Sequence, residues 1–201
     1  ELSPPGILVW RSLLQWLGGI GVIVMAIAIF PMLSVGGMQL FKAENFETPE
    51  KVVPRATSLT RGIFIIYSVL TIIWASLLYL SGMSSFDSIL HSMTTIATGG
   101  YSTKSGSIGS FNSQIIDWVI ILGMIFGSLP FVHYLAMTKG SYRDLVNDSQ
   151  VRWFLVLLTI LVLTIFCLLL LNGTYDLKNS IRYSAFNVTS ILTGTGYGTA
   201  D

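Results

Sequence analysis

Residues 193–199 read Thr-Gly-Thr-Gly-Tyr-Gly-Thr, with glycine at every second position. Glycine tolerates positive φ and lacks a Cβ, so this segment can hold an extended backbone whose carbonyl groups turn to one side. The stretch Tyr183–Ala200 carries no charge, yet it is too polar and too short to cross a bilayer. We interpret Arg182–Asp201 as a short helix that enters a membrane and returns as extended backbone, which requires surrounding protein or a water-filled cavity.

A weaker copy of this segment lies 96 residues earlier. Residues 98–103 read Thr-Gly-Gly-Tyr-Ser-Thr, and a shift of 96 superposes four identical pairs: Ser88 and Ser184, Gly100 and Gly196, Tyr101 and Tyr197, and Thr103 and Thr199. The helix starts at Arg61 and Arg152 match at a shift of 91. The pattern indicates an internal repeat of helix, short helix with Gly-rich loop, and helix, which is a common way for membrane proteins to surround a central path.

The composition is that of a membrane protein. Of the 201 residues, 52% are hydrophobic and 10% are charged, against about 25% charged in soluble domains. Four runs of at least 21 residues carry no charge: 12–41, 62–86, 118–138 and 153–175. Because about 20 apolar helical residues span a bilayer, the sequence predicts an all-α membrane protein. Its four membrane helices are expected at about 10–33, 61–80, 115–137 (kinked by Pro130) and 153–171, with one re-entrant pore helix between the second and third and another after the fourth.

Charge placement and the repeat together predict the organisation of the chain. Seven of the eleven Lys and Arg residues lie in two polar linkers or at the helix starts beside them, which places the linkers in the cytoplasm. Residues 1–34 are expected to close a first repeat, followed by a linker at 35–60. Residues 61–138 form the second repeat, with pore helix and loop at 84–103. A linker at 139–151 leads to a third repeat, 152–201, which is expected to be truncated. We interpret the chain as an internal piece of a longer protein.

The two loops have the chemistry expected of a monovalent-cation filter. A potassium ion entering a pore exchanges its water shell for rings of backbone carbonyls. Neither loop core contains a carboxylate, and the short helices before them direct negative helix C-termini toward the same place. The aromatic rings of Tyr101 and Tyr197 are expected to pack behind the loops and hold their width. The predicted potassium-binding positions are the backbones of Thr98, Gly99, Gly100, Tyr101, Thr195, Gly196, Tyr197 and Gly198.

These repeats resemble the superfamily of Trk, Ktr and HKT potassium transporters, and three stretches resemble its bacterial TrkH subunits: 15–21 (QWLGGIG), 36–41 (GGMQLF) and 97–103 (ATGGYST). The resemblance covers the whole chain. It implies a multi-pass protein of the bacterial inner membrane, in which four non-identical repeats form one pore for potassium uptake or symport. The glycine that marks each filter in that family corresponds to Gly100 and Gly196. The resemblance also implies a homodimer and a cytosolic, nucleotide-binding regulatory subunit, with K⁺ as the transported ion and no cofactor in this chain. Ser102 stands where a potassium channel has a second glycine, which implies fewer well-formed ion sites.

Other polar residues have structural interpretations. Asp117 suits the N-terminus of its helix, as does Asp87, while His91 is expected to brace the first pore helix and His133 to be a neutral hydrogen-bonding residue. The sequence holds no nucleophile–base pair, zinc ligand set, nucleotide loop or basic stripe, so neither an enzyme nor nucleic-acid binding is expected. The alternative to a pore is a non-conducting bundle, or a carrier of another fold, whose Gly-rich loops only pack helices. The nearly pure apolar character of the long helices favours the pore, since a carrier needs polar residues at the membrane midplane.

Overall fold

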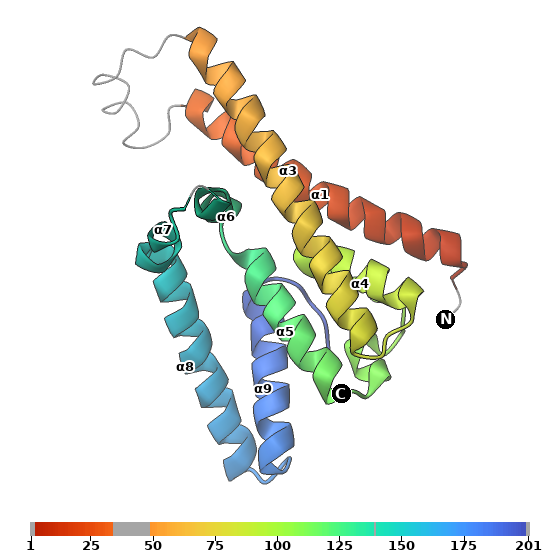
Figure 1. Ribbon diagram of the computed structural model, residues 1–201. Coiled ribbons are helices and arrows are strands. Elements are labelled where there is room, and N and C mark those ends of the chain that lie inside the picture. Colours follow the sequence, from red (N-terminus) through yellow and green to blue (C-terminus); the bar gives the residue numbers. More distant parts are fainter. Residues whose placement is uncertain (1–2, 34–48, 139, 200–201) are drawn as a thin grey trace.

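The computed structural model describes residues 3–33, 49–138 and 140–199, and for 26–33, 49–57 and 144 it describes the backbone alone. Within these ranges every regular element is helical (Figure 1). The helices are α1 (Pro5–Leu33), α3 (Pro49–Leu80), α4 (Ser85–Ile96), the 3₁₀ helix η1 (Ser107–Phe111), α5 (Gln114–Ser128), α6 (Phe131–Thr138), α7 (Arg143–Asn147), α8 (Ser149–Leu171) and α9 (Leu177–Leu192). The all-α membrane fold predicted from the sequence is confirmed.

Three of these helices are long and apolar enough to cross a membrane, namely α1 over Pro5–Met25, α3 over Ser58–Leu80, and all of α8. A fourth span exists if α5 and α6 are counted together, but these two helices meet at 87°. The predicted kink at Pro130 is therefore a break. Leu129 adopts an extended conformation, because a residue that precedes proline is disfavoured in the α region.

Four helices begin earlier than the sequence predicts, namely α1 at Pro5, α3 at Pro49, α8 at Ser149 and α9 at Leu177. Helix α3 begins at Pro49, inside the expected linker, because hydropathy marks only the part of a helix that lies in lipid and Pro is tolerated in a first turn. Helix α9 begins at Leu177 rather than Arg182 for the same reason, since its first turn is polar. Residues 34–48, which include the start of the first expected linker (35–60) and the 36–41 motif, lie outside the described residues.

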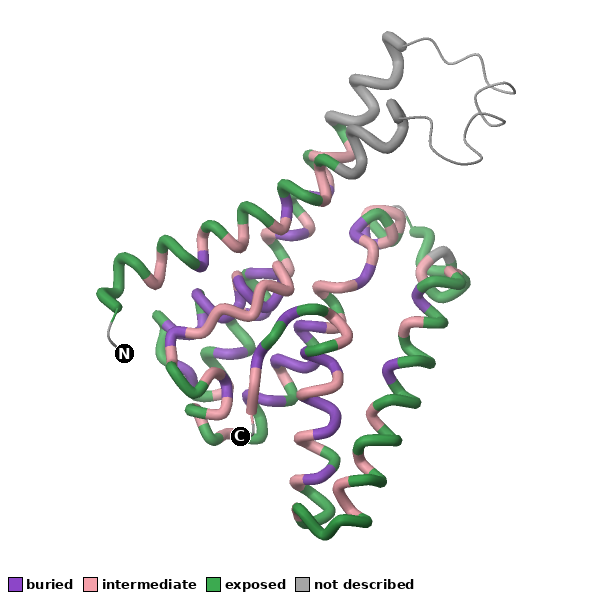
Figure 2. Tube along the Cα trace, turned by 180° about the vertical axis from the view of Figure 1, so that it is seen from behind, coloured by how far each residue is buried: buried purple, intermediate pink, exposed green. Residues whose placement is uncertain are grey.

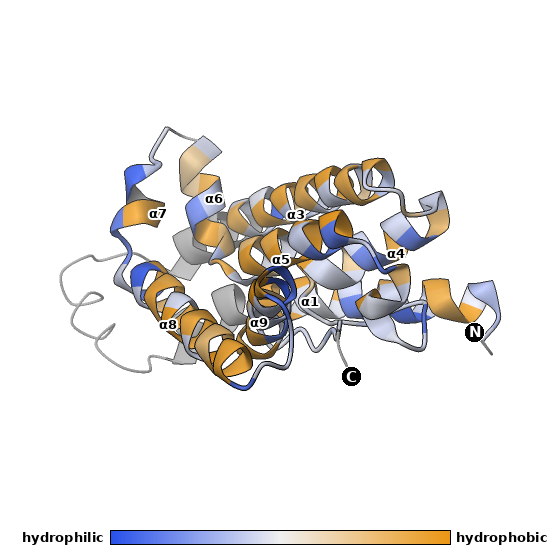
Figure 3. Ribbon diagram, turned by 90° about the horizontal axis from the view of Figure 1, so that it is seen from below, coloured by the Kyte–Doolittle hydropathy of each residue, from blue (hydrophilic) through white to orange (hydrophobic). Residues whose placement is uncertain are grey.

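Helices α4 and α9, which correspond to the two expected pore helices, pack against several other helices. Helix α4 packs against α1, α3 and α5, whereas α9 packs against α5 and α8. Figure 2 shows burial concentrated around these two helices, with exposed residues along α8 and the outer part of α1. The exposed side chains of α8 are mostly apolar (Figure 3), including Trp153, Ile160 and Leu171. Helices of 12 and 16 residues are shorter than the roughly 20 that a span needs, so α4 and α9 are held by protein packing.

Glycines on α5 allow α4 to approach closely. A Cβ added at Gly127 would lie 2.7 Å from the carbonyl oxygen of Ile96, the last residue of α4. One added at Gly123 would lie 2.5 Å from Cγ2 of Thr95 and 2.3 Å from Nε1 of Trp74. Small residues at such contacts are the usual means of close helix packing in membranes. They fix the end of α4, and therefore the start of the loop that follows it.

Candidate functional site: two Gly-rich loops

The first Gly-rich loop, loop A (residues 97–103), turns back along α4. After Ala97, which is still helical, Thr98 has φ of 49° and Gly100 has φ of 69°. The amides of Gly99 and Gly100 both donate to the carbonyl of Thr94, at 2.8 and 3.3 Å. The hydroxyl of Thr94 in turn donates to the carbonyl of Tyr101 at 2.9 Å. The loop is thus fastened to the last turns of its own helix.

The second, loop B (residues 193–199), repeats this geometry at positions shifted by 96. Gly194 and Gly196 have φ of 73° and 86°, matching Thr98 and Gly100. The amide of Gly196 donates to the carbonyl of Ser190 at 3.3 Å, and the hydroxyl of Ser190 donates to the carbonyl of Tyr197 at 2.7 Å. The two segments therefore share backbone conformation and anchoring hydrogen bonds, which a chance similarity of composition would not produce.

The two loops contact each other directly. A Cβ added at Gly100 would lie only 1.8 Å from the carbonyl oxygen of Thr195, so the backbone of loop B occupies the space that a side chain there would need. Tyr197 is buried, and its hydroxyl lies 2.6 Å from Oγ1 of Thr94 in α4. The structure thus brings the eight predicted residues together in one place, four in each loop.

The two tyrosines have different surroundings. Tyr197 packs behind loop B against α4, as the sequence predicts. Tyr101 is half-buried, and the guanidinium of Arg11 on α1 lies 3.8 Å from the centre of its ring. This cation–π contact ties loop A to α1 rather than to another short helix.

Gln15, the first residue of the 15–21 stretch, for which the sequence predicts no role, also holds loop A. Gln15 on α1 donates from Nε2 to the carbonyl of Gly99 at 2.8 Å, and its Oε1 accepts from the amide of Tyr101 at 3.2 Å. The signal that could have revealed it is a long polar side chain within an uncharged run of 30 residues, 12–41.

The end of loop A, at Thr103, is held by a hydrogen bond to a buried carboxylate. Asp87 accepts hydrogen bonds from Thr103 at 2.5 Å and from Ser84, the N-cap of α4, at 2.8 Å. Burial alone would raise the pKa of Asp87, but these hydrogen bonds outweigh it and the pKa lies below its usual value. The prediction that Asp87 suits a helix N-terminus is confirmed, with the additional contact to the loop.

His91 braces α4 against loop A, as expected. Its Nδ1 lies 2.8 Å from the carbonyl of Asp87, so this nitrogen carries the proton, and its Nε2 accepts from the hydroxyl of Ser102 at 2.9 Å. Burial lowers the pKa of His91 and so favours this neutral form. The described residues contain no group of three or more His, Cys, Asp or Glu side chains that could hold a metal ion.

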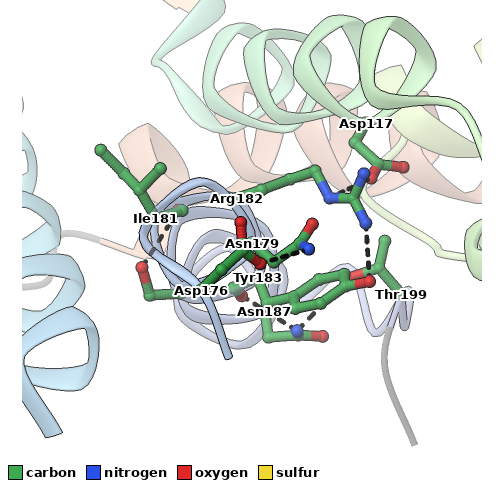
Figure 4. A network of polar contacts seen from close by, with 9 residues as sticks. Asp117, Asp176, Asn179, Ile181, Arg182, Tyr183, Asn187 and Thr199 are labelled. Carbon is green, nitrogen blue, oxygen red and sulfur yellow. Dashed lines mark hydrogen bonds and ion pairs between the residues drawn. The ribbon is translucent and has the colours of Figure 1, made fainter. Parts of the chain in front are cut away.

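A buried ion pair lies beside loop B. Nε of Arg182 on α9 is 3.4 Å from Oδ2 of Asp117 on α5, and both side chains are nearly inaccessible. The same guanidinium donates to the hydroxyl of Tyr183 at 2.6 Å. Figure 4 shows how these groups continue through Asn187 to Thr199 at the end of the loop. Asp117 was predicted to complement its helix, and the partner on α9 was missed because the two residues are 65 positions apart.

A cavity of about 620 Å³ lies at the C-terminal ends of the two short helices. Ala97 and Thr98 after α4 and Thr193 after α9 line it, together with Leu129 and Pro130 at the break between α5 and α6. Among the described residues that line it, none has a charged side chain. Because a helix C-terminus carries about half a negative charge, two such ends directed at one space make it favourable for a cation.

Comparison with known proteins agrees with this arrangement. The family model for TrkH, a cation transport protein, matches residues 1–201. The Trk system potassium uptake protein TrkI of Halomonas elongata is 41% identical over 197 residues, 98% of this chain and 40% of that protein. TrkH of Escherichia coli K12 is 36% identical over 200 residues, 98% of this chain and 41% of that protein.

A solved structure is also similar. The crystal structure of the potassium transporter TrkH from Vibrio parahaemolyticus has a TM-score of 0.84 and 33% identity, covering 98% of this chain and 40% of that one. This chain thus spans about two fifths of the length of these relatives. From the matching family model, the apolar helices and the shared fold, it follows that the chain is a multi-pass membrane protein and belongs to the TrkH family of cation transport proteins.

Proposed function

We propose that the chain is part of the pore-forming subunit of a bacterial potassium uptake system, and that K⁺ passes along the backbone carbonyls of residues 98–101 and 195–198. The observation that carries this proposal is the matched backbone of loops A and B. Positive φ occurs at the same two aligned positions in each loop, and the loops meet at Gly100 and Thr195. Two adjacent copies of one unusual conformation are what a ring of carbonyls built from repeats requires.

The electrostatics of the site support a monovalent cation. The lining of the cavity below the loops is uncharged, so the attraction comes from the ends of α4 and α9 and from carbonyl dipoles. Partial charges of this kind favour a cation without holding it as tightly as a carboxylate ring would hold a divalent ion. Conduction needs this balance, because an ion must leave the site as readily as it enters.

The relatives suggest the setting of this pore. They are named Trk system potassium uptake proteins, which supports a subunit that lies in bacterial inner-membrane lipid and works with further components. We propose that residues 61–138 and 152–201 are two of the pore repeats, joined to a helix of another repeat at 1–34 through cytoplasmic linkers at 35–60 and 139–151. The assembly proposed is a homodimer with a cytosolic nucleotide-binding regulatory subunit.

The competing proposal is that the loops only pack helices and conduct nothing, or that the protein is a carrier of another design. The contacts of Gly100 and Tyr197 would serve packing equally well. What favours conduction is the placement of the cavity and of two helix C-termini directly at the loops, since a packing element has no need of either.

Rubidium uptake into liposomes distinguishes the two. The complete natural protein containing this sequence is reconstituted, and uptake is measured with K⁺ or Na⁺ as competitor, for the wild type and for Gly196→Ser. Inhibition by K⁺ at lower concentration than Na⁺, with selectivity reduced or uptake lost in the variant, is the expected result. Uptake that the variant leaves unchanged would show that the loops are packing elements.

A further inference from the structure

Gln15 breaks the equivalence of the two loops. Position 99 in loop A aligns with position 195 in loop B, but the carbonyl of Gly99 accepts a hydrogen bond from Gln15. Within the described part of the chain, the carbonyl of Thr195 accepts none and instead lies against Gly100. The two loops therefore differ at this position, where the carbonyl of Gly99 is held by an amide and that of Thr195 lies against the other loop.

Gln15 also explains why residue 99 is a glycine. Gly99 does not have positive φ, so its conformation does not call for glycine. A Cβ there would lie 2.6 Å from both Cδ and Oε1 of Gln15. Loop B has a threonine at the aligned position, and its hydroxyl lies 2.8 Å from Oγ1 of Thr193. Glycine at 99 is thus explained by the close approach of Gln15.

Gln15 is itself held in place. The next residue, Trp16, donates from Nε1 to the hydroxyl of Thr71 on α3 at 3.0 Å, and its carbonyl accepts from the hydroxyl of Tyr67 at 3.0 Å. These bonds fix the position of α1 relative to α3. The amide of Gln15 therefore reaches loop A from a rigid support, and both of its polar atoms are used on the loop.

We propose that Gln15 is a specificity-determining positioning residue, which sets the conformation of residues 99–101 from α1 and thereby tunes discrimination between K⁺ and Na⁺. This inference rests on the proposed function. A carbonyl that is already engaged by an N–H donor is a weaker cation ligand and rotates less freely. The amide of Tyr101, held by Oε1, fixes the direction of the carbonyl in the same peptide group, that of Gly100. Loss of Gln15 loosens both groups, and a loose ring accommodates the smaller Na⁺ better.

The test compares discrimination ratios, defined as the Na⁺ concentration that halves rubidium uptake divided by the K⁺ concentration that does so. In the complete protein, Gln15→Leu removes both hydrogen bonds and is expected to lower the ratio by roughly two- to tenfold. Gln15→Glu keeps the size of the side chain and the acceptor for Tyr101, but it sets a carboxylate oxygen against the carbonyl of Gly99, and is also expected to lower the ratio. Gln114→Glu makes the equivalent change at an exposed position of α5 and is the control. It is expected to leave the discrimination ratio unchanged.

A double-mutant cycle with Gly99→Ala tests the contact itself. Because the added methyl overlaps Gln15, Gly99→Ala is expected to lower the ratio less in a Gln15→Ala background than in the wild type. If the wild type takes up rubidium selectively while Gln15→Leu and the isosteric Gln15→Glu both keep the wild-type ratio, the role of Gln15 is refuted and the pore stands. If the wild type takes up no rubidium, the proposed function fails, and the role of Gln15 with it.

Discussion

The hydroxyl of Tyr197 in loop B lies 2.6 Å from Oγ1 of Thr94 and 3.2 Å from Oγ1 of Thr95, both in α4. The same hydroxyl donates to the carbonyl of His91 at 3.3 Å. The loop that follows α9 is therefore anchored on the short helix that precedes loop A. One buried phenol joins two segments that are about 100 residues apart in the sequence, and it fixes the distance between the two loops.

Tyr197→Phe is therefore expected to destabilise the protein. It removes a buried hydroxyl that lies within hydrogen-bonding distance of three oxygen atoms, while the hydroxyl of Thr94 still donates to the carbonyl of Tyr101. A net loss of about 1–2 kcal/mol is expected, measured as a lower melting temperature in detergent. Tyr101→Phe is the matched control, because the hydroxyl of Tyr101 has no hydrogen bond to the described residues. Equal melting temperatures for the two variants would contradict the anchoring role of Tyr197.

Gly100→Ala and Gly196→Ala distinguish two reasons why a position requires glycine, namely a positive φ and the close approach of another segment. Both residues have positive φ, which costs a non-glycine residue about 1–2 kcal/mol. Among the described residues, a Cβ at Gly196 meets nothing within 4 Å, whereas one at Gly100 lies 1.8 Å from the carbonyl oxygen of Thr195. Gly196→Ala is expected to cost only the backbone strain, and Gly100→Ala distinctly more, since loop B must move. The melting temperatures of the two variants provide the comparison, and a Gly196→Ala loss as large as that of Gly100→Ala would refute the contact between the loops.

The buried ion pair provides a further prediction. Removing one partner of such a pair leaves an unpaired charge and costs about 3–5 kcal/mol, so Arg182→Gln or Asp117→Asn alone is expected to lower stability strongly. The double variant leaves no buried charge and is expected to lose much less than the sum of the two. Purified yield and melting temperature measure this. Additive losses would mean that the two side chains act independently despite the 3.4 Å that separates them.

The sequence predicted the parts of this fold that depend on local pattern. Uncharged runs located the membrane helices, and the 96-residue repeat located loops A and B. The conformation of Thr98 could not be predicted in this way. A β-branched residue with φ of 49° is an exception, and only the alignment with Gly194 indicates it. Helix ends also went wrong, at Pro49 and Leu177, because polar residues continue a helix into water without leaving a hydropathy signal.

Contacts between distant segments could not be predicted from the sequence, for a different reason. Gln15 and Gly99, or Asp117 and Arg182, lie on separate elements, and no periodicity within one element records a partner on another. The residue types only indicated that each polar group in an apolar setting needs a partner. Which partner it finds depends on how α1, α5 and α9 pack, which is decided by the fold as a whole.

His91 offers the last prediction, a pH dependence with a known sign. Burial lowers its pKa from the ordinary 6.5, so the unfolded chain binds a proton more readily than the folded one. The contribution of neutral His91 to the stability is therefore complete above about pH 6.5, and it declines as the pH falls from there toward the pKa of His91 in the folded protein. The aligned residue in the other repeat is Asn187, whose amide donates to the carbonyl four residues earlier, as His91 does. His91→Asn is expected to keep that bond and to reduce the fall in melting temperature between about pH 7.5 and 5.5. A variant that loses stability at low pH as steeply as the wild type would show that another group is responsible.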